Sequence, residues 1–251
     1  MTEENELIAK RFLELDRKAY LNGYYTFTDF LGLKEQSVFA DIRCRLSGKF
    51  RRYGGTDGTE RVMIRFGDEE DIGYDLPFPI TLLLVRPKAE KFADRLTHRD
   101  FLGALLNLGI ERDTLGDIII RNNTGYIFVK EDIAKYIETE LTRIAHTDVT
   151  VTPTDELPEG DLYKKESARV QVSSVRLDAV IARAFHLSRE DAQSLFAKRL
   201  VFADGREISS TSYSPKLGET VSVRGYGRFV YIGEVGKSKK GKINIEIEIY
   251  K

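Results

Sequence analysis

A stretch rich in proline, threonine and acidic residues at positions 152–160 divides the chain, so the sequence on each side of it must fold separately. The stretch, Thr-Pro-Thr-Asp-Glu-Leu-Pro-Glu-Gly, has no apolar periodicity and is typical of a linker. A softer break lies at Pro77 and Pro79. We therefore expect an α+β protein made of four parts: an N-terminal α/β domain at 1–76, a middle domain at 77–152, a linker at 153–172 and a C-terminal domain at 173–251.

The charges are unevenly distributed about this linker. Residues 173–251 contain 14 Lys and Arg against 9 Asp and Glu, a balance of +5, whereas the remaining 172 residues have a balance of −6. A basic end on a nearly neutral chain indicates that this end faces a polyanion such as nucleic acid.

Other features exclude several classes of protein. No apolar run approaches the roughly 18 residues that would span a membrane, and the acidic N-terminus does not resemble a secretory signal. Cys44 is the only cysteine, so disulfides within the chain and multi-cysteine zinc sites are excluded. We expect a cytoplasmic, monomeric protein with no membrane contact, no metal and no cofactor.

The middle segment has a readable order of elements. An apolar run at 80–85 predicts a buried strand, and Thr97 to Asp100 has the form of a helix capping box. Two short β-rich runs at 118–120 and 126–129 flank an Asn-Asn-Thr-Gly turn. An apolar helical stripe from Ile133 to Ile144 and a strand at 149–151 follow. The order βαββαβ is the ferredoxin-like arrangement that RNA-recognition motifs also use.

Tyr126 and Phe128 alternate onto one face of the third strand of this middle domain. They partly match the aromatic base-stacking motif of RNA-recognition motifs, although Thr124 and Glu131 depart from it. The two rings either stack on RNA bases or pack against another domain.

The first 75 residues contain a glycine-rich turn between basic flanks. Arg51, Arg52 and Arg61 surround it and are secondary candidates for RNA contacts, although the pattern of glycines favours a plain hairpin turn. The spacing is not that of a P-loop. We also expect strands at 39–46 and 62–66.

The C-terminal segment predicts two short helices followed by small strands. Ser173 or Ser174 is expected to cap a helix with an apolar stripe from Leu177 to Ala184, and a second helix opens at Ser188. Asp204-Gly205 marks a tight hairpin, and alternating isoleucines at 243–249 mark a one-sided strand. Helices that present arginines beside basic strand edges would form a phosphate-binding surface. The candidate RNA-binding residues are Arg176, Arg183, Ser188, Arg189, Gln193, Lys198, Arg199, Arg206, Arg224, Arg228, Lys239 and Lys240.

Some of these residues also have structural explanations. Lys198 and Arg199 would complement a helix C-terminus, and the lysine-rich run at 237–242 would suit a solvated hairpin loop.

The order of motifs at this end resembles the RNA-binding domain named after ribosomal protein S-four, an αL-motif domain. The motifs are Ser174-x-Arg176-Leu177-Asp178, Ser188-Arg189-x-x-Ala192-Gln193, Val201-x-x-Asp204-Gly205 and Gly218-Glu219-x-Val221. With Val223-Arg224-Gly225-Tyr226-Gly227-Arg228-Phe229, residues 97–105 and Arg112-x-x-Leu115-Gly116-Asp117-Ile118, nearly the whole chain resembles the bacterial YlmH family. This resemblance implies association with the large ribosomal subunit, ribosomal RNA and tRNA, in the clearing of stalled translation complexes, and it hints at cell division.

The sequence predicts no catalytic residue. His98, His146 and His186 are far apart, and no Gly-x-Gly-x-x-Gly motif follows a strand. We therefore expect an RNA-binding factor that acts by positioning. The alternatives are an adaptor whose N-terminal domains dock a protein partner in cell division, and an RNA-modifying enzyme.

Overall fold

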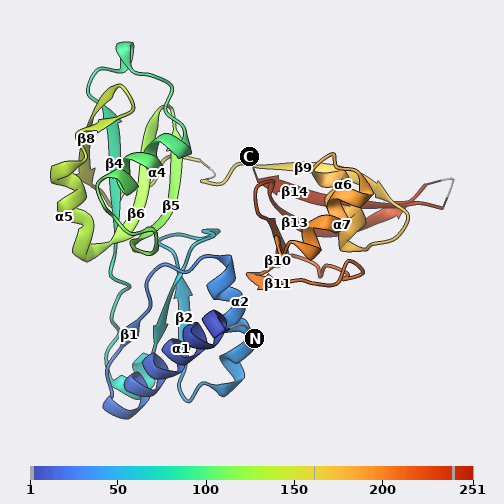
Figure 1. Ribbon diagram of the computed structural model, residues 1–251, viewed down its shortest axis with the longest axis horizontal. Helices are drawn as coiled ribbons and strands as arrows, with labels where there is room; N and C mark the ends of the chain where they lie inside the picture. Colours follow the sequence, from blue (N-terminus) through green and yellow to red (C-terminus); the bar gives the residue numbers. More distant parts are fainter. Residues whose placement is uncertain (1–2, 161, 239–240, 251) are drawn as a thin grey trace. The chain divides into compact units, whose positions relative to one another are not determined.

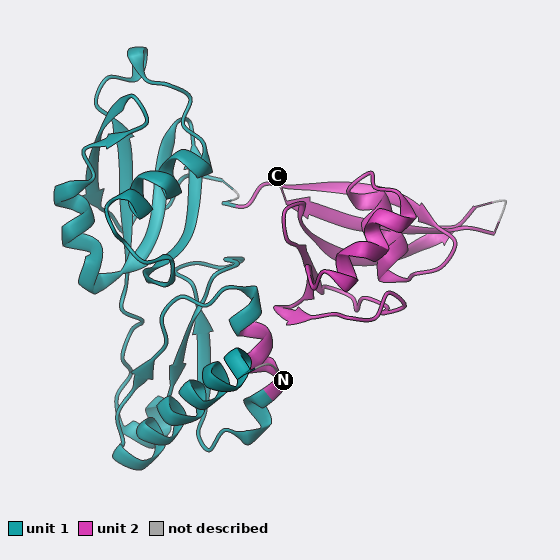
Figure 2. Ribbon diagram, viewed as in Figure 1, with its two compact units in different colours: residues 1–35, 42–162 teal, residues 36–41, 163–251 magenta. Residues whose placement is uncertain are grey.

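A computed structural model describes residues 3–160, 162–238 and 241–250. The chain separates into two compact units, one made of residues 1–35 and 42–162 and the other of residues 36–41 and 163–251 (Figure 2). Helices and strands are mixed in both units, in agreement with the expected α+β class. Every helix in the described part of the chain is too short or too polar to cross a membrane.

The first unit begins with a long helix and a small sheet (Figure 1). Its elements are α1 (Glu3–Asn22), β1 (Thr26–Phe27), α2 (Leu33–Ile42, of which residues 36–41 are counted with the second unit), a 3-10 turn (Arg43–Arg45), β2 (Phe50–Tyr53), β3 (Met63–Phe66) and α3 (Glu69–Ile72). The strands are antiparallel in the order β1-β3-β2. The strand that we expected at 39–46 is wrong: Val38, Phe39 and Ile42 are buried at helical spacing, which a strand cannot provide.

A five-stranded antiparallel sheet follows in the same unit. Its elements are β4 (Ile80–Pro87), α4 (His98–Asn107), β5 (Leu115–Arg121), β6 (Thr124–Lys130), α5 (Glu131–Glu140), β7 (Arg143–Ile144) and β8 (Thr147–Pro153), with 3-10 turns at Glu90–Phe92 and Arg112–Thr114. The strand order is β5-β6-β4-β8-β7. The βαββαβ order of elements is present, and the capping box at Thr97 is formed.

The predicted stripe to Ile144 overruns its helix. Helix α5 ends at Glu140, and Ile144 lies in β7, where it is buried in the same core as Ile137. Apolar residues of a helix and of the strand that follows it can therefore pack in one core at a sequence spacing that resembles that of a longer helix.

Gly125 in β6 lies directly against a side chain of this core. A Cβ atom at this position would overlap the ring of Phe101, which is fully buried. We expect Gly125→Ala to reduce the free energy of unfolding by about 1–3 kcal/mol through overpacking. Gly103, inside α4, has open space around its Cβ position, so Gly103→Ala should instead stabilise the unit by up to about 1 kcal/mol. Differential scanning calorimetry of the two variants would test the opposite signs.

The second unit carries two helices on a six-stranded sheet. Its elements are β9 (Lys165–Val172), α6 (Leu177–Ala184), α7 (Arg189–Ala197), β10 (Val201–Ala203), β11 (Arg206–Glu207), β12 (Thr220–Val223), β13 (Gly227–Lys237) and β14 (Ile243–Tyr250). The strand order is β11-β10-β12-β13-β14-β9. The expected turn at Asp204-Gly205 joins β10 to β11, and both residues have positive φ.

The linker predicted at 153–172 extends too far toward the C-terminus, because its last residues belong to a strand. Residues 165–172 form β9, which pairs along its whole length with β14. Ala168, Val170 and Val172 alternate with polar residues and pack against the core of the second unit. Their period of two residues is typical of a strand, but the charged residues at the start of β9 make the segment resemble a linker.

Candidate nucleic-acid interface

Helix α6 starts without a side-chain cap. Arg176 is its N-cap residue, and the backbone N–H groups of Leu177 and Asp178 donate to the carbonyl oxygens of Tyr213 (2.8 Å) and Thr211 (3.3 Å). The expected cap by Ser173 or Ser174 is therefore wrong, because the loop before β12 supplies the acceptors instead. This arrangement places Arg176 just outside the helix rather than on its surface.

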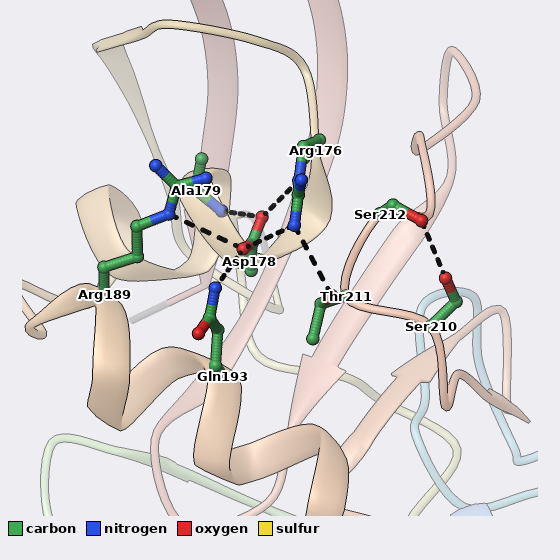
Figure 3. Close-up of polar contacts among 8 residues, drawn as sticks. All are labelled: Arg176, Asp178, Ala179, Arg189, Gln193, Ser210, Thr211 and Ser212. Carbon is green, nitrogen blue, oxygen red and sulfur yellow. Dashed lines mark hydrogen bonds and ion pairs between the residues drawn. The ribbon is translucent and has the colours of Figure 1, made fainter.

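Asp178 organises the arginines around it (Figure 3). Its carboxylate is fully buried and accepts two hydrogen bonds from Arg176, from Nε to Oδ1 and from Nη2 to Oδ2, both at 3.1 Å. Gln193 Nε2 donates to Oδ2 (2.9 Å), and Arg189 Nε lies 3.7 Å from the same oxygen. The side chains of Arg176 and Arg189 stay 38% and 55% exposed. One buried carboxylate thus fixes two guanidinium groups that solvent still reaches.

The ionised form of Asp178 is the favoured one. Burial alone would raise the pKa of this carboxyl, but the hydrogen bonds from Gln193 and Arg176 outweigh burial and leave the pKa below its usual value. The group of Arg176, Arg189 and Asp178 therefore carries a net charge of +1 at neutral pH.

Arg189 also lines a pocket beside α6. The pocket has a volume of about 390 Å³, and Arg183, Arg189 and Lys242 contribute its charged side chains. None of the described residues that line it is acidic. Three cations around a hollow of this size suit a phosphate group of a nucleic-acid backbone. Together, Arg176, Arg183, Arg189, Gln193 and Lys242 are called the helix-side surface below.

Other predicted contacts have local structural roles. The Ser188 hydroxyl caps α7 by accepting from the Asp191 N–H (3.0 Å), so the candidate Ser188 is a helix cap. Arg199 follows α7 with positive φ and pairs with Glu207 (Nε to Oε1, 2.7 Å). Lys198 and Arg206 are exposed near the end of α7 and on β11.

Arg224 and Arg228 do not join the helix-side surface. Their neighbours Val223 and Phe229 point into the core under the helices, so the two arginines alternate onto the opposite face of the sheet. There Arg224 lies over Phe202, and Arg228 is held between Tyr163 and Tyr250, 4.6 Å and 4.0 Å from the ring centres. The expectation of one arginine cluster is corrected to two faces. Lys239 and Lys240 lie outside the described residues.

The secondary candidates also divide. Arg51 and Arg52 are exposed on β2. The prediction that Arg61 contacts RNA is wrong, because its guanidinium donates to the carbonyl oxygens of Leu115 (2.8 Å) and Phe30 (2.6 Å) inside the first unit. Phe128 is likewise wrong as a base-stacking residue.

The ring of Phe128 is buried. It is only 2% exposed and packs beneath Gly55, so the face of this ring is covered and cannot itself stack on a base. Of the two proposed roles for this aromatic pair, Phe128 takes the packing role. Tyr126, on the same strand face, is partly buried.

Sequence reasoning missed Asp178 as part of the interface. The sequence does contain a signal for this role. Asp178 interrupts an apolar helical stripe, follows Arg176 by two residues and precedes an Arg-x-x-x-Gln pair. Because a buried charge needs partners, this pattern indicates that the carboxylate binds the neighbouring arginines.

Comparisons with known proteins identify the family of the chain. Residues 76–157 match the family model described as "Putative RNA-binding domain in YlmH". Over 225 residues the chain is 30% identical to ribosome-associated protein quality control protein P2 of Bacillus subtilis, covering 88% of this chain and 86% of that protein. The chain belongs to the YlmH family. A solved structure of cell division protein ylmH from Streptococcus pneumoniae is similar with 19% identity and a TM-score of 0.49, over 61% of this chain and 93% of that one. The resemblance of the chain to the YlmH family is confirmed.

Proposed function

We propose that this member of the YlmH family is a cytoplasmic, monomeric RNA-binding protein that associates with the large ribosomal subunit during quality control of stalled translation. Its second unit would be a domain of the S-four type, and its ligands would be ribosomal RNA, tRNA or both. The name of the Bacillus subtilis relative supports the ribosomal setting, and the match at 76–157 supports RNA as the ligand. The protein would act by binding and positioning rather than by catalysis.

The fixed arginine pair on Asp178 is the observation that carries this proposal. Guanidinium groups held by a buried carboxylate are pre-organised, so less side-chain freedom is lost when they bind phosphate. The adjoining pocket of Arg183, Arg189 and Lys242 extends the same surface. Successive phosphates of one RNA strand would be contacted in a fixed register.

Reversing charge at Arg183 and Arg189 tests the proposal. We expect the Arg183→Glu, Arg189→Glu variant to lose co-sedimentation with large subunits in a sucrose gradient, since each phosphate contact adds to affinity. Arg176 is kept, because it donates two hydrogen bonds to the buried Asp178, whereas Arg189 lies 3.7 Å from this carboxylate and its side chain is 55% exposed, so a glutamate there can turn into solvent.

The control reverses two cations elsewhere. Lys10 and Arg17 are exposed on α1, so Lys10→Glu, Arg17→Glu makes the same change in net charge away from the helix-side surface. This variant should still co-sediment. Equal co-sedimentation of both variants would contradict the proposal.

A further inference from the structure

A second hollow lies in the first unit, on the face of the five-stranded sheet that α4 and α5 leave uncovered. Leu83, Val85, Ile127 and Val129 point into the core beneath these helices, so Leu82 and Phe128 point the other way. A pocket of about 520 Å³ opens on this second face. Its lining residues are Tyr53, Gly55, Pro77, Phe78, Ile80, Thr81, Leu82, Phe128, Pro153, Thr154, Asp155 and Leu157.

Two aromatic rings form the accessible wall of the pocket. Tyr53 is 39% exposed, and its hydroxyl donates to the carbonyl oxygen of Gly55 (2.6 Å), which fixes the ring at the mouth. The ring of Phe78 lies 5.5 Å from that of Tyr53 and is backed by the buried guanidinium of Arg65, 5.6 Å from its centre. Rings held in this way present a rigid surface on which a flat, aromatic ligand can stack.

The charges around the pocket distinguish a base from a phosphate. Asp155 lines the pocket, and its carboxylate would repel a phosphate inside it. Arg51 is exposed on β2 and shares a strand face with Tyr53, so a cation lies beside the mouth. An apolar, aromatic interior with a cation outside fits a nucleobase whose phosphate stays in solvent.

We propose that this pocket receives an unpaired nucleobase of a single RNA strand, stacked on Tyr53 and Phe78. All lining residues except Tyr53 and Gly55 lie within the segment that matches the RNA-binding domain model. The site is separate from the helix-side surface and does not depend on the function proposed for that surface. It gives the chain a second RNA contact, made by stacking rather than by phosphate pairing.

A single tryptophan provides a direct test in the full chain, which contains no tryptophan of its own. In Tyr53→Trp, the only indole would stand at the pocket mouth, where a stacked base quenches its fluorescence. We expect an unlabelled oligouridylate of about ten nucleotides to reduce the emission by about half. The exposed Phe92 gives the matched control, because it lies outside the pocket, and Phe92→Trp should keep its emission.

Affinity measurements complete the test. Tyr53→Ala should weaken oligouridylate binding about tenfold, whereas Tyr53→Phe, which keeps the ring but loses its hydrogen bond to Gly55, should weaken binding much less. Adding Tyr53→Trp to the Arg183→Glu, Arg189→Glu background separates the two proposals, since quenching at saturating RNA should persist there. Unchanged emission with saturating RNA would overturn the proposal, and so would quenching by a proline-rich peptide but not by RNA.

Discussion

Replacing Asp178 with asparagine is expected to weaken RNA binding about tenfold, even though the change adds to the positive charge of the surface. The carboxylate offers two acceptor oxygens, and Arg176, Gln193 and the Ala179 N–H all donate to them. Asparagine has nearly the same volume but only one acceptor oxygen, and its NH₂ group would face other donors. The two arginines would then lose their fixed positions.

Stability should fall together with affinity. Hydrogen bonds to a charged group each contribute about 1.5–3 kcal/mol, and exposure of Arg176 and Arg189 lets water replace part of what is lost. We expect the free energy of unfolding of the second unit to fall by about 2 kcal/mol. Fluorescence anisotropy with labelled RNA and thermal unfolding of the same preparation would measure both effects.

The opposite sign in a control variant makes this prediction decisive. Glu190 is exposed in the first turn of α7, and Glu190→Gln changes the net charge by the same amount. By electrostatics alone both variants would bind RNA slightly more tightly. If Asp178→Asn followed Glu190→Gln in binding more tightly, a positioning role for Asp178 would be untenable.

Local sequence patterns predicted most elements of the second unit. The alternating isoleucines predicted β14, and Asp204-Gly205 predicted the hairpin of β10 and β11, because each signal is contained within a few residues. Strand β9 was not predicted, because its pairing partner lies more than 70 residues away in the sequence and its first residues are charged. Contacts that depend on distant partners cannot be read from a short window.

The arginines show the same limit at the level of side chains. Arg176 and Arg183 are seven residues apart in the sequence, a spacing that would place both on one side of a helix. In fact Arg176 precedes the helix and turns back onto Asp178, while Arg183 lines the pocket. Composition identified the basic surface, but the sheet's two faces and one buried carboxylate determine which cations belong to it.

Arg61 was predicted to contact RNA, but its side chain makes hydrogen bonds inside the protein. Replacing it with methionine should lower the free energy of unfolding of the first unit by about 2–4 kcal/mol. The guanidinium satisfies the carbonyl oxygens of Phe30, Arg112 and Leu115, and methionine would leave them without this donor.

A neighbouring charge limits this loss. Burial and, after it, the charge of Arg61 together lower the pKa of Arg112 to about 10. Removing Arg61 relieves that repulsion, so the pKa of Arg112 should rise and the net loss should stay in the lower half of the range.

The exposed Arg52 provides the comparison, since Arg52→Met should change stability by less than about 0.5 kcal/mol. Thermal unfolding and RNA affinity, measured below the transition, separate the two roles that an arginine can have here. A structural Arg61 predicts a lower unfolding temperature with unchanged RNA affinity in Arg61→Met. A guanidinium that is bound to three carbonyl groups cannot be removed without lowering stability. Weaker RNA binding of Arg61→Met at unchanged stability would therefore contradict the structural role and assign Arg61 to the RNA-binding surface.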